Sequence, residues 1–324
     1  MKIAIYQFTH ISYFYNKMQV RKKWLWLMFC LIQMQVLFAQ TDTVYIYPII
    51  HLDSVVIADS KSGFDVSDFI LMVQNDTTFY QSFRTLRQVQ YSSAANVRMF
   101  DKRGLTQASL NNKSLQQTAN NCRWMVPFYQ TTTGDFFDKK GDMNYYTAKM
   151  FSYIFLYGDT ICSGNVSTQT NDKEISQLEK RKDQLKILIF NPGKPVEGIP
   201  FINNKLSIFD EGMMQYYNYS ITSQRNEAGT ECYVFSIKVK EGVKTGDVVL
   251  KEMITWFKKA DFSIVARDYR LSTDNLVFDF DVTMQVKMIQ LQNRIIPGMI
   301  HYSGTWNAPG KKRETGSVLI TIDI

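Results

Sequence analysis

A strict alternation of apolar and polar positions is the clearest pattern in the second half of the chain. Over 276–288 every second residue is apolar, and most of the residues between them are polar or charged; 231–239 repeats the pattern. A period of two is that of a strand with one face in the core and the other in solvent. We expect further strands at 205–210, 214–222, 249–258, 262–272, 294–306 and 316–324.

Short turns such as 225–229 and 240–242 separate several of these strands, and no helical pattern intervenes. Successive strands so close in sequence pair in an antiparallel meander. Strands of this length curl readily into a barrel or half-barrel. The inner face of such a sheet has to be filled by side chains, by helices or by a ligand.

Helical spacing dominates the first half, with helices expected directly after Asp65, over 79–86 and over 143–157, and a charged surface helix over 170–186. The segment 43–59 reads as one or two strands, and 88–125 as a polar hairpin that turns at 101–104. The prediction is an α+β fold: a curled antiparallel β-meander, or half-barrel, in which several helices from the N-terminal half cover one face. Residues 40–324 form its single domain.

The first 39 residues have the three parts of a secretory signal. Basic residues 21–23 precede a largely apolar stretch, 24–37, which ends near the small Ala39. Met18 is then the expected start of translation. The alternative is a membrane anchor, but the uninterrupted apolar run is too short to cross ~30 Å of hydrocarbon. We expect cleavage after Ala39, a periplasmic or outer-membrane-associated protein, and no transmembrane span in the mature chain.

The net charge of +7 comes mostly from this leader. It holds five basic residues and no acidic ones, so 32 of the 37 Lys and Arg remain to face 30 Asp and Glu. A nearly neutral chain without a dense basic run is a poor candidate for binding nucleic acid. The 45% of hydrophobic residues is enough for a sizeable core.

Three cysteines follow Ala39, so at least one is unpaired. We predict a disulfide between Cys122 and Cys162, which flank an aromatic-rich segment; three buried free thiols are the alternative. The chain has no CxxC pair, so neither a zinc ribbon nor a redox motif is expected, and no cofactor is predicted.

Candidate binding residues lie on the predicted strands. Arg267 and Asp268 stand side by side in an apolar strand, so one of them points inward. An inward Arg267 would meet an anionic head group or pair with an inward acid as a structural bridge. An aromatic set would bind a sugar or lipid, or fill the core. Its candidate ligand-binding members are Tyr217, Trp256, Tyr302 and Trp306.

Asp279 and Asp281 share the polar face of one strand, where they would bind calcium or a sugar, or simply be solvated. Only two histidines follow Ala39, and their spacing favours no catalytic triad.

Several short stretches resemble a family of exported proteins typical of Bacteroidetes. They are Gly198–Phe201, Asn204–Asp210, Cys232–Phe235, Thr255–Phe257, Val265–Tyr269, Asp279–Asp281 and Tyr302–Trp306. The order of helices and meander is also similar in architecture to the LolA/LolB type of half-barrel carrier. That resemblance implies an open barrel with a helical lid that carries lipidated proteins across the periplasm. It places no functional residue on this chain.

Three hypotheses of function follow. The first is a non-catalytic binding or carrier module for an apolar ligand, a lipid or a lipidated protein, in the cell envelope. The second is a structural or interaction component of an outer-membrane or polysaccharide-handling assembly, with an envelope protein as its partner. The third is a secreted hydrolase, which the scarcity of histidines makes the weakest of the three.

Overall fold

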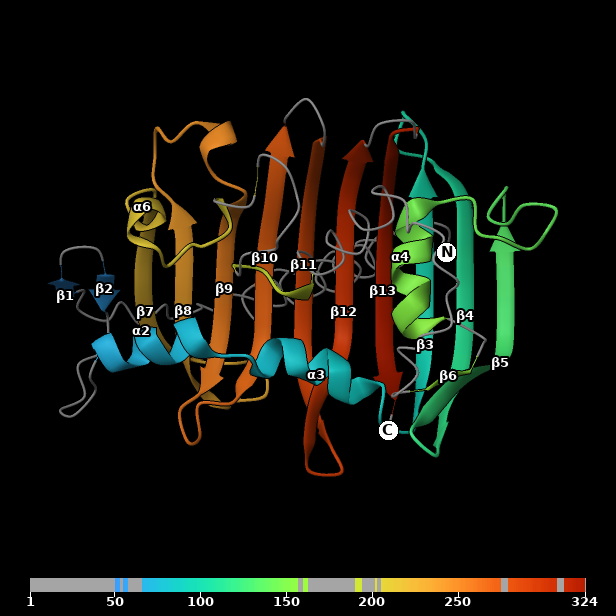
Figure 1. Ribbon diagram of the computed structural model, residues 1–324, viewed down its shortest axis with the longest axis horizontal. Helices are drawn as coiled ribbons and strands as arrows, with labels where there is room; N and C mark the ends of the chain where they lie inside the picture. The colour runs from blue at the N-terminus through green and yellow to red at the C-terminus, as the bar shows by residue number, and fades with distance from the viewer. Residues whose placement is uncertain are drawn as a thin grey trace, which may run out of the picture. The chain divides into compact units, whose positions relative to one another are not determined.

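The computed structural model of the protein describes residues 50–52, 55–57, 66–156, 160–162, 190–193, 202, 205–274, 279–307 and 312–323. Thirteen strands in this part of the chain form one open sheet (Figure 1). In chain order they are β1 (Ile50–Leu52), β2 (Val55–Ile57), β3 (Tyr91–Phe100), β4 (Thr106–Ala119), β5 (Cys122–Thr133), β6 (Ile161–Cys162), β7 (Tyr217–Arg225), β8 (Glu231–Val239), β9 (Leu250–Lys258), β10 (Ile264–Asp274), β11 (Asp279–Leu291), β12 (Arg294–Asn307) and β13 (Glu314–Asp323).

The order of the strands across the sheet is β1-β2-β7-β8-β9-β10-β11-β12-β13-β3-β4-β5-β6. Strands β7 to β13 therefore form the expected antiparallel meander. Strand β3 then pairs with the C-terminal strand β13, so the N-terminal hairpins extend the sheet beyond it. The contact between β2 and β7 is parallel. The predicted α+β half-barrel of antiparallel strands is confirmed.

The helices follow from this topology. Strand β2 and strand β3 are separated in the sheet by seven other strands, or about 38 Å at the usual strand spacing. The chain crosses this distance with helix α2 (Val66–Asn75) and helix α3 (Thr78–Leu86), which lie across the strands in Figure 1. Their 19 residues cover about 29 Å. Helix α4 (Tyr146–Phe155) lies over β13 and β3.

The expected alternation sets the two faces of the sheet. On β11 the side chains of Phe280, Val282, Met284 and Val286 are buried, while the residues between them face solvent. The helices pack on the buried face, which we call the inner face. The ring of Phe69 on α2, for example, lies edge-on to the rings of Tyr233, Phe235 and Phe257, with centroids 5.5–6.0 Å apart.

Two predictions of local structure need correction. Residues 205–210 form turns rather than a strand, followed by the short helix α6 (Glu211–Met214). Leu206 and Ile208 are both buried although they lie in a loop. Over six residues, this pattern of burial looks the same as that of a strand. The segment 88–125, which was expected to be a two-stranded hairpin, contains β3, β4 and the beginning of β5, and β5 continues to Thr133. A 3₁₀ turn, Thr245–Asp247, precedes β9. The helix predicted over 170–186 lies outside the described residues.

Candidate functional site

Arg267 of β10 points to the inner face and is buried beneath the junction of α2 and α3. Its Nε donates a hydrogen bond to Thr255 Oγ1 at 2.9 Å. Its Nη2 lies 3.8 Å from Asp76 Oδ2, and its guanidinium carbon is 4.4 Å from the centre of the Phe79 ring. The acid that pairs with Arg267 is therefore in the loop between the helices. Of the two roles expected for an inward Arg267, this geometry is that of the structural bridge.

Burial lowers the pKa of Arg267 to about 10, against the attraction of Asp76, which raises it. The direction shows that the loss of hydration outweighs the pairing, as is common for buried ion pairs. The guanidinium is still a cation at neutral pH. The ion pair therefore adds little net stability, but loss of Asp76 would leave an uncompensated buried charge.

The aromatic set does not form one binding surface. Tyr217 and Tyr302 are fully buried on the inner face, where the Tyr217 hydroxyl donates to Leu250 O at 2.9 Å. Trp306 is also buried; its indole N–H donates to the Tyr302 hydroxyl, and its ring centroid is 4.8 Å from that of Phe280. Trp256 is half-buried on the opposite face, because it alternates with the buried Thr255 and Phe257. These positions favour the core-filling alternative for the three inner residues.

Asp279 and Asp281 lie on the outer face, and each meets a guanidinium. Asp281 forms a two-point contact with Arg270, at 2.9 and 2.6 Å, which holds its pKa below the usual range. Asp279 accepts from Arg313 at 3.0 Å. The part of the chain that the structure describes contains no cluster of three or more His, Cys, Asp or Glu suited to a metal ion.

Cys122 and Cys162 are joined by a disulfide that links the start of β5 to β6. Cys232 is a free, buried thiol, and burial raises its pKa. The disulfide therefore fixes the tip of the hairpin formed by β4 and β5, at the edge of the sheet opposite β1 and β2.

This end of the inner face differs from the rest in a way that the sequence does not predict. Whereas β7 to β13 bury mostly apolar side chains, β3 to β5 bury a band of polar ones. We call this the polar band; its members are Ser93, Asn112, Ser114, Gln116 and Arg123. Polar and apolar residues do not alternate along 111–118, so the sequence gives no signal of which side chains point inward.

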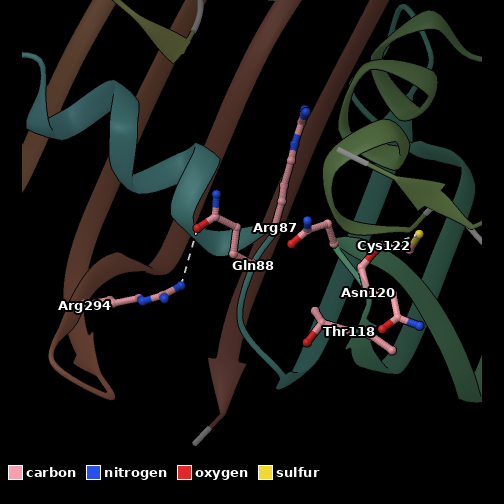
Figure 2. Close-up of a pocket in the computed structure, with 8 residues that line it drawn as sticks. Arg87, Gln88, Thr118, Asn120, Cys122 and Arg294 are labelled. Atoms are coloured by element: carbon pink, nitrogen blue, oxygen red, sulfur yellow. Dashed lines mark hydrogen bonds between the residues drawn. The ribbon is translucent and has the colours of Figure 1, made fainter. Parts of the chain in front are cut away.

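The polar band ends at an open pocket of about 430 Å³. Three elements line it: the end of α3 with Arg87 and Gln88, the hairpin between β4 and β5, and Arg294 at the start of β12 (Figure 2). Asn120 and Asn121 form the tip of the hairpin with φ angles of 51° and 59°. Such left-handed pairs favour Asn and make the tight two-residue turn.

Among the described residues no helix is both long and apolar enough to cross a membrane.

No family model and no curated protein matches the chain. Three solved structures do. One is a DUF1329 family protein from Desulfovibrio piger, with 12% identity, coverage of 76% of this chain and 88% of that one, and a TM-score of 0.23. The second, from Vibrio parahaemolyticus, is described as an outer membrane lipoprotein-sorting protein domain, with 7% identity, coverage of 76% and 89%, and a TM-score of 0.26.

The third is a LolA superfamily protein from Nitrosomonas europaea, with 8% identity, coverage of 76% and 91%, and a TM-score of 0.24. The names of the second and third structures match the LolA/LolB type of carrier that the order of helices and strands resembles. Membership in an exported Bacteroidetes family stays a prediction.

Proposed function

We propose that the protein is an exported, non-catalytic module that binds or carries an apolar ligand, a lipid or the acyl chain of a lipidated protein, in the cell envelope. The observation that carries this proposal is the inner face. From β7 to β13 its buried side chains are mostly apolar, and helices from the first half of the chain cover it. The hydrophobic effect is non-directional, so an acyl chain can bury the apolar face of the sheet as well as a helix does.

The position of the helices supports the same proposal. Helices α2 and α3 connect two distant strands and lie across the sheet, where they present Phe69, Phe79 and Phe83 to it. The polar contact of Asp76 with Arg267 lies at their junction. A cover that is held by exchangeable apolar contacts is suited to opening over a ligand, and Arg267 would then become available to an anionic head group.

A second candidate is an interaction component of an envelope assembly, and the edge of β5 favours it. Within the described residues, the pairing of β5 with β6 is limited to Cys122 and Arg123, and β5 is exposed from Val126 onward. Phe128 and Tyr129 there are 63% and 49% exposed. An edge with free backbone groups and aromatic side chains is a template for pairing with another chain. In this case the inner face is a filled core.

Native mass spectrometry separates the two candidates. The full chain is expressed in a bacterial host and recovered from the periplasm without detergent, and its bound lipid is extracted and weighed. We expect a loss of mass that corresponds to cleavage after Ala39, and a reproducible adduct of about one lipid per chain. Phe128→Ser/Tyr129→Ser is the control, because it alters only the exposed edge and should carry the same adduct.

A clean mass, still clean after incubation with phosphatidylethanolamine and phosphatidylglycerol vesicles, contradicts the carrier proposal. In that case the same edge variant becomes the test of the second candidate. It should lose the envelope proteins that cross-link to the wild-type chain.

A further inference from the structure

The open pocket at the end of the polar band is positively charged. Two of its lining residues are arginines, Arg87 and Arg294, and none is acidic. The two reach it from different elements, the end of α3 and the start of β12 (Figure 2). The Arg294 guanidinium donates to Gln88 Oε1 at 3.4 Å, and within the described part of the chain it forms no ion pair. It is exposed and therefore able to turn toward a ligand.

A third arginine lies directly behind the wall of this pocket. Arg123 follows the lining residue Cys122 and stands opposite Thr118, another lining residue, in the pairing of β4 with β5. Arg123 is buried, and its Nη1 donates to Gln116 Oε1 at 3.2 Å. The pocket is thus bordered by a cluster of cations in a protein whose mature chain is otherwise nearly neutral.

Tyr91 stands opposite Gln116, the residue that accepts from Arg123, in the pairing of β3 with β4. Its hydroxyl is buried, and in the described structure it has no hydrogen-bond partner. Burial raises the pKa of Tyr91, and the charges of Arg123 and Arg87 act in the opposite direction. A buried hydroxyl without a partner is rare in native proteins and calls for an explanation such as a bound ligand or water.

One feature works against an anion here. The C-terminal end of α3 borders the pocket and carries roughly half a negative charge. However, the carbonyl oxygens of Leu86 and Val89 accept hydrogen bonds from Gln116 Nε2, at 2.8 and 2.7 Å. These hydrogen bonds occupy the two carbonyl groups, and the residues that line the pocket include two guanidinium groups and no carboxylate.

We propose that this pocket binds the anionic oxygen-rich group of a small molecule, a phosphate or carboxylate, between Arg87, Arg294 and the tip of the hairpin between β4 and β5. Planar guanidinium groups with several donors suit such oxygens. Thr118, Gln88 and the side-chain amide of Asn120 supply further hydrogen bonds from the walls. The volume fits a small molecule rather than a bare ion. The proposal is independent of the apolar ligand proposed above.

Isothermal titration of the full chain tests this proposal, at constant ionic strength, first with inorganic phosphate. We expect a saturable isotherm for the wild type. Arg294→Gln, which changes an exposed residue, should weaken binding at least fivefold, and Arg87→Gln/Arg294→Gln should abolish it. Arg103→Gln is the matched control, since its side chain is 78% exposed at the far end of β4 and outside the pocket. It should bind as the wild type does, and circular dichroism confirms the fold of each variant.

A second titration identifies the source of the anion. The probe is a 1-acyl-glycerol 3-phosphate below its critical micelle concentration, with the uncharged monoacylglycerol as comparison. Binding at least tenfold tighter than that of inorganic phosphate, and lost in the double variant, assigns the pocket to a lipid headgroup. Equal affinities assign it to a free anion. The proposal is overturned if neither phosphate probe saturates, or if Arg103→Gln weakens binding as much as Arg294→Gln does.

Discussion

The contact between Arg267 and Asp76 gives the sharpest prediction about the cover of the sheet. Arg267→Met replaces the guanidinium with an apolar side chain of similar length and leaves Asp76 without its cation. The hydrogen bond to Thr255 Oγ1 and the contact with Phe79 are lost as well. Asp76→Asn is the reciprocal change. It keeps an oxygen to accept from Thr78 N, as Asp76 Oδ1 does at 3.0 Å, so the start of α3 is preserved.

The magnitude follows from the burial of the pair. The side chains of Arg267 and Asp76 are 7% and 11% exposed, and their atoms are 3.8 Å apart, which corresponds to an attraction of about 4 kcal/mol at an effective dielectric constant of about 20. Removal of one partner of a buried pair typically costs about 3–5 kcal/mol. Asp76 retains its bonds to Thr78, so we expect about 3 kcal/mol for Arg267→Met. The double variant, Asp76→Asn/Arg267→Met, removes both charges and should recover about 2 kcal/mol of that loss.

Urea unfolding followed by circular dichroism measures these differences, with the slope of the transition compared between variants. Arg270→Met is the matched control. It breaks an ion pair with Asp281 on the outer face of the same strand, where the arginine side chain is 54% exposed. Its effect should stay within about 1 kcal/mol. If the double variant is destabilised by the sum of the two single changes, Asp76 and Arg267 are not coupled and the reasoning fails.

Three further predictions concern the rest of the fold. Burial raises the pKa of six tyrosines, which are Tyr91, Tyr145, Tyr217, Tyr219, Tyr269 and Tyr302. Their contribution to stability should be constant below pH ~10 and should fall above it by about 1.4 kcal/mol per pH unit for each of them, because they ionise on unfolding. Tyr217→Phe should make this fall shallower in urea titrations between pH 8 and 11, and an unchanged slope contradicts it. Reduction of the disulfide between Cys122 and Cys162, 40 residues apart, should cost about 4 kcal/mol and lower the urea midpoint; an unchanged midpoint after reduction tells against it. Glu314→Ala removes the acceptors of two backbone N–H groups at the start of α4, at 2.8 and 3.0 Å, and should cost about 1–2 kcal/mol. Hydrogen exchange should then become faster in α4 while it stays unchanged in α2.

The strands of the second half could be predicted because each has one solvent-exposed face and one buried face. The alternation that marks 276–288 reappears in β11, and the other strands of the meander lie within a few residues of their expected ends. The same pattern misled at 205–210, where a loop buries Leu206 and Ile208. Periodicity reports which side chains are buried, and six residues are too few to show whether backbone pairing accompanies that burial.

The candidate site was less predictable, for a different reason. That one of Arg267 and Asp268 points inward follows from the pleat of a strand, but its partner Asp76 belongs to a loop far away in sequence. Only the folding of α2 and α3 across the sheet brings the two together. The pocket is harder still, because Arg87 and Arg294 sit at the ends of unrelated elements, and no local pattern joins them.

The inner face thus has an apolar part and a polar part, and the topology explains why both belong to one sheet. The meander from β7 to β13 is amphipathic in the ordinary way, and alone it would end at β13. Because β3 adds to that strand, the polar band of β3 to β5 continues the apolar surface instead of standing apart from it. A ligand with an apolar chain and an anionic head would match both parts in order along the sheet. The acylated phosphate probe is therefore the more informative of the two, because only a joined surface would make it bind more tightly than its head and its tail do separately.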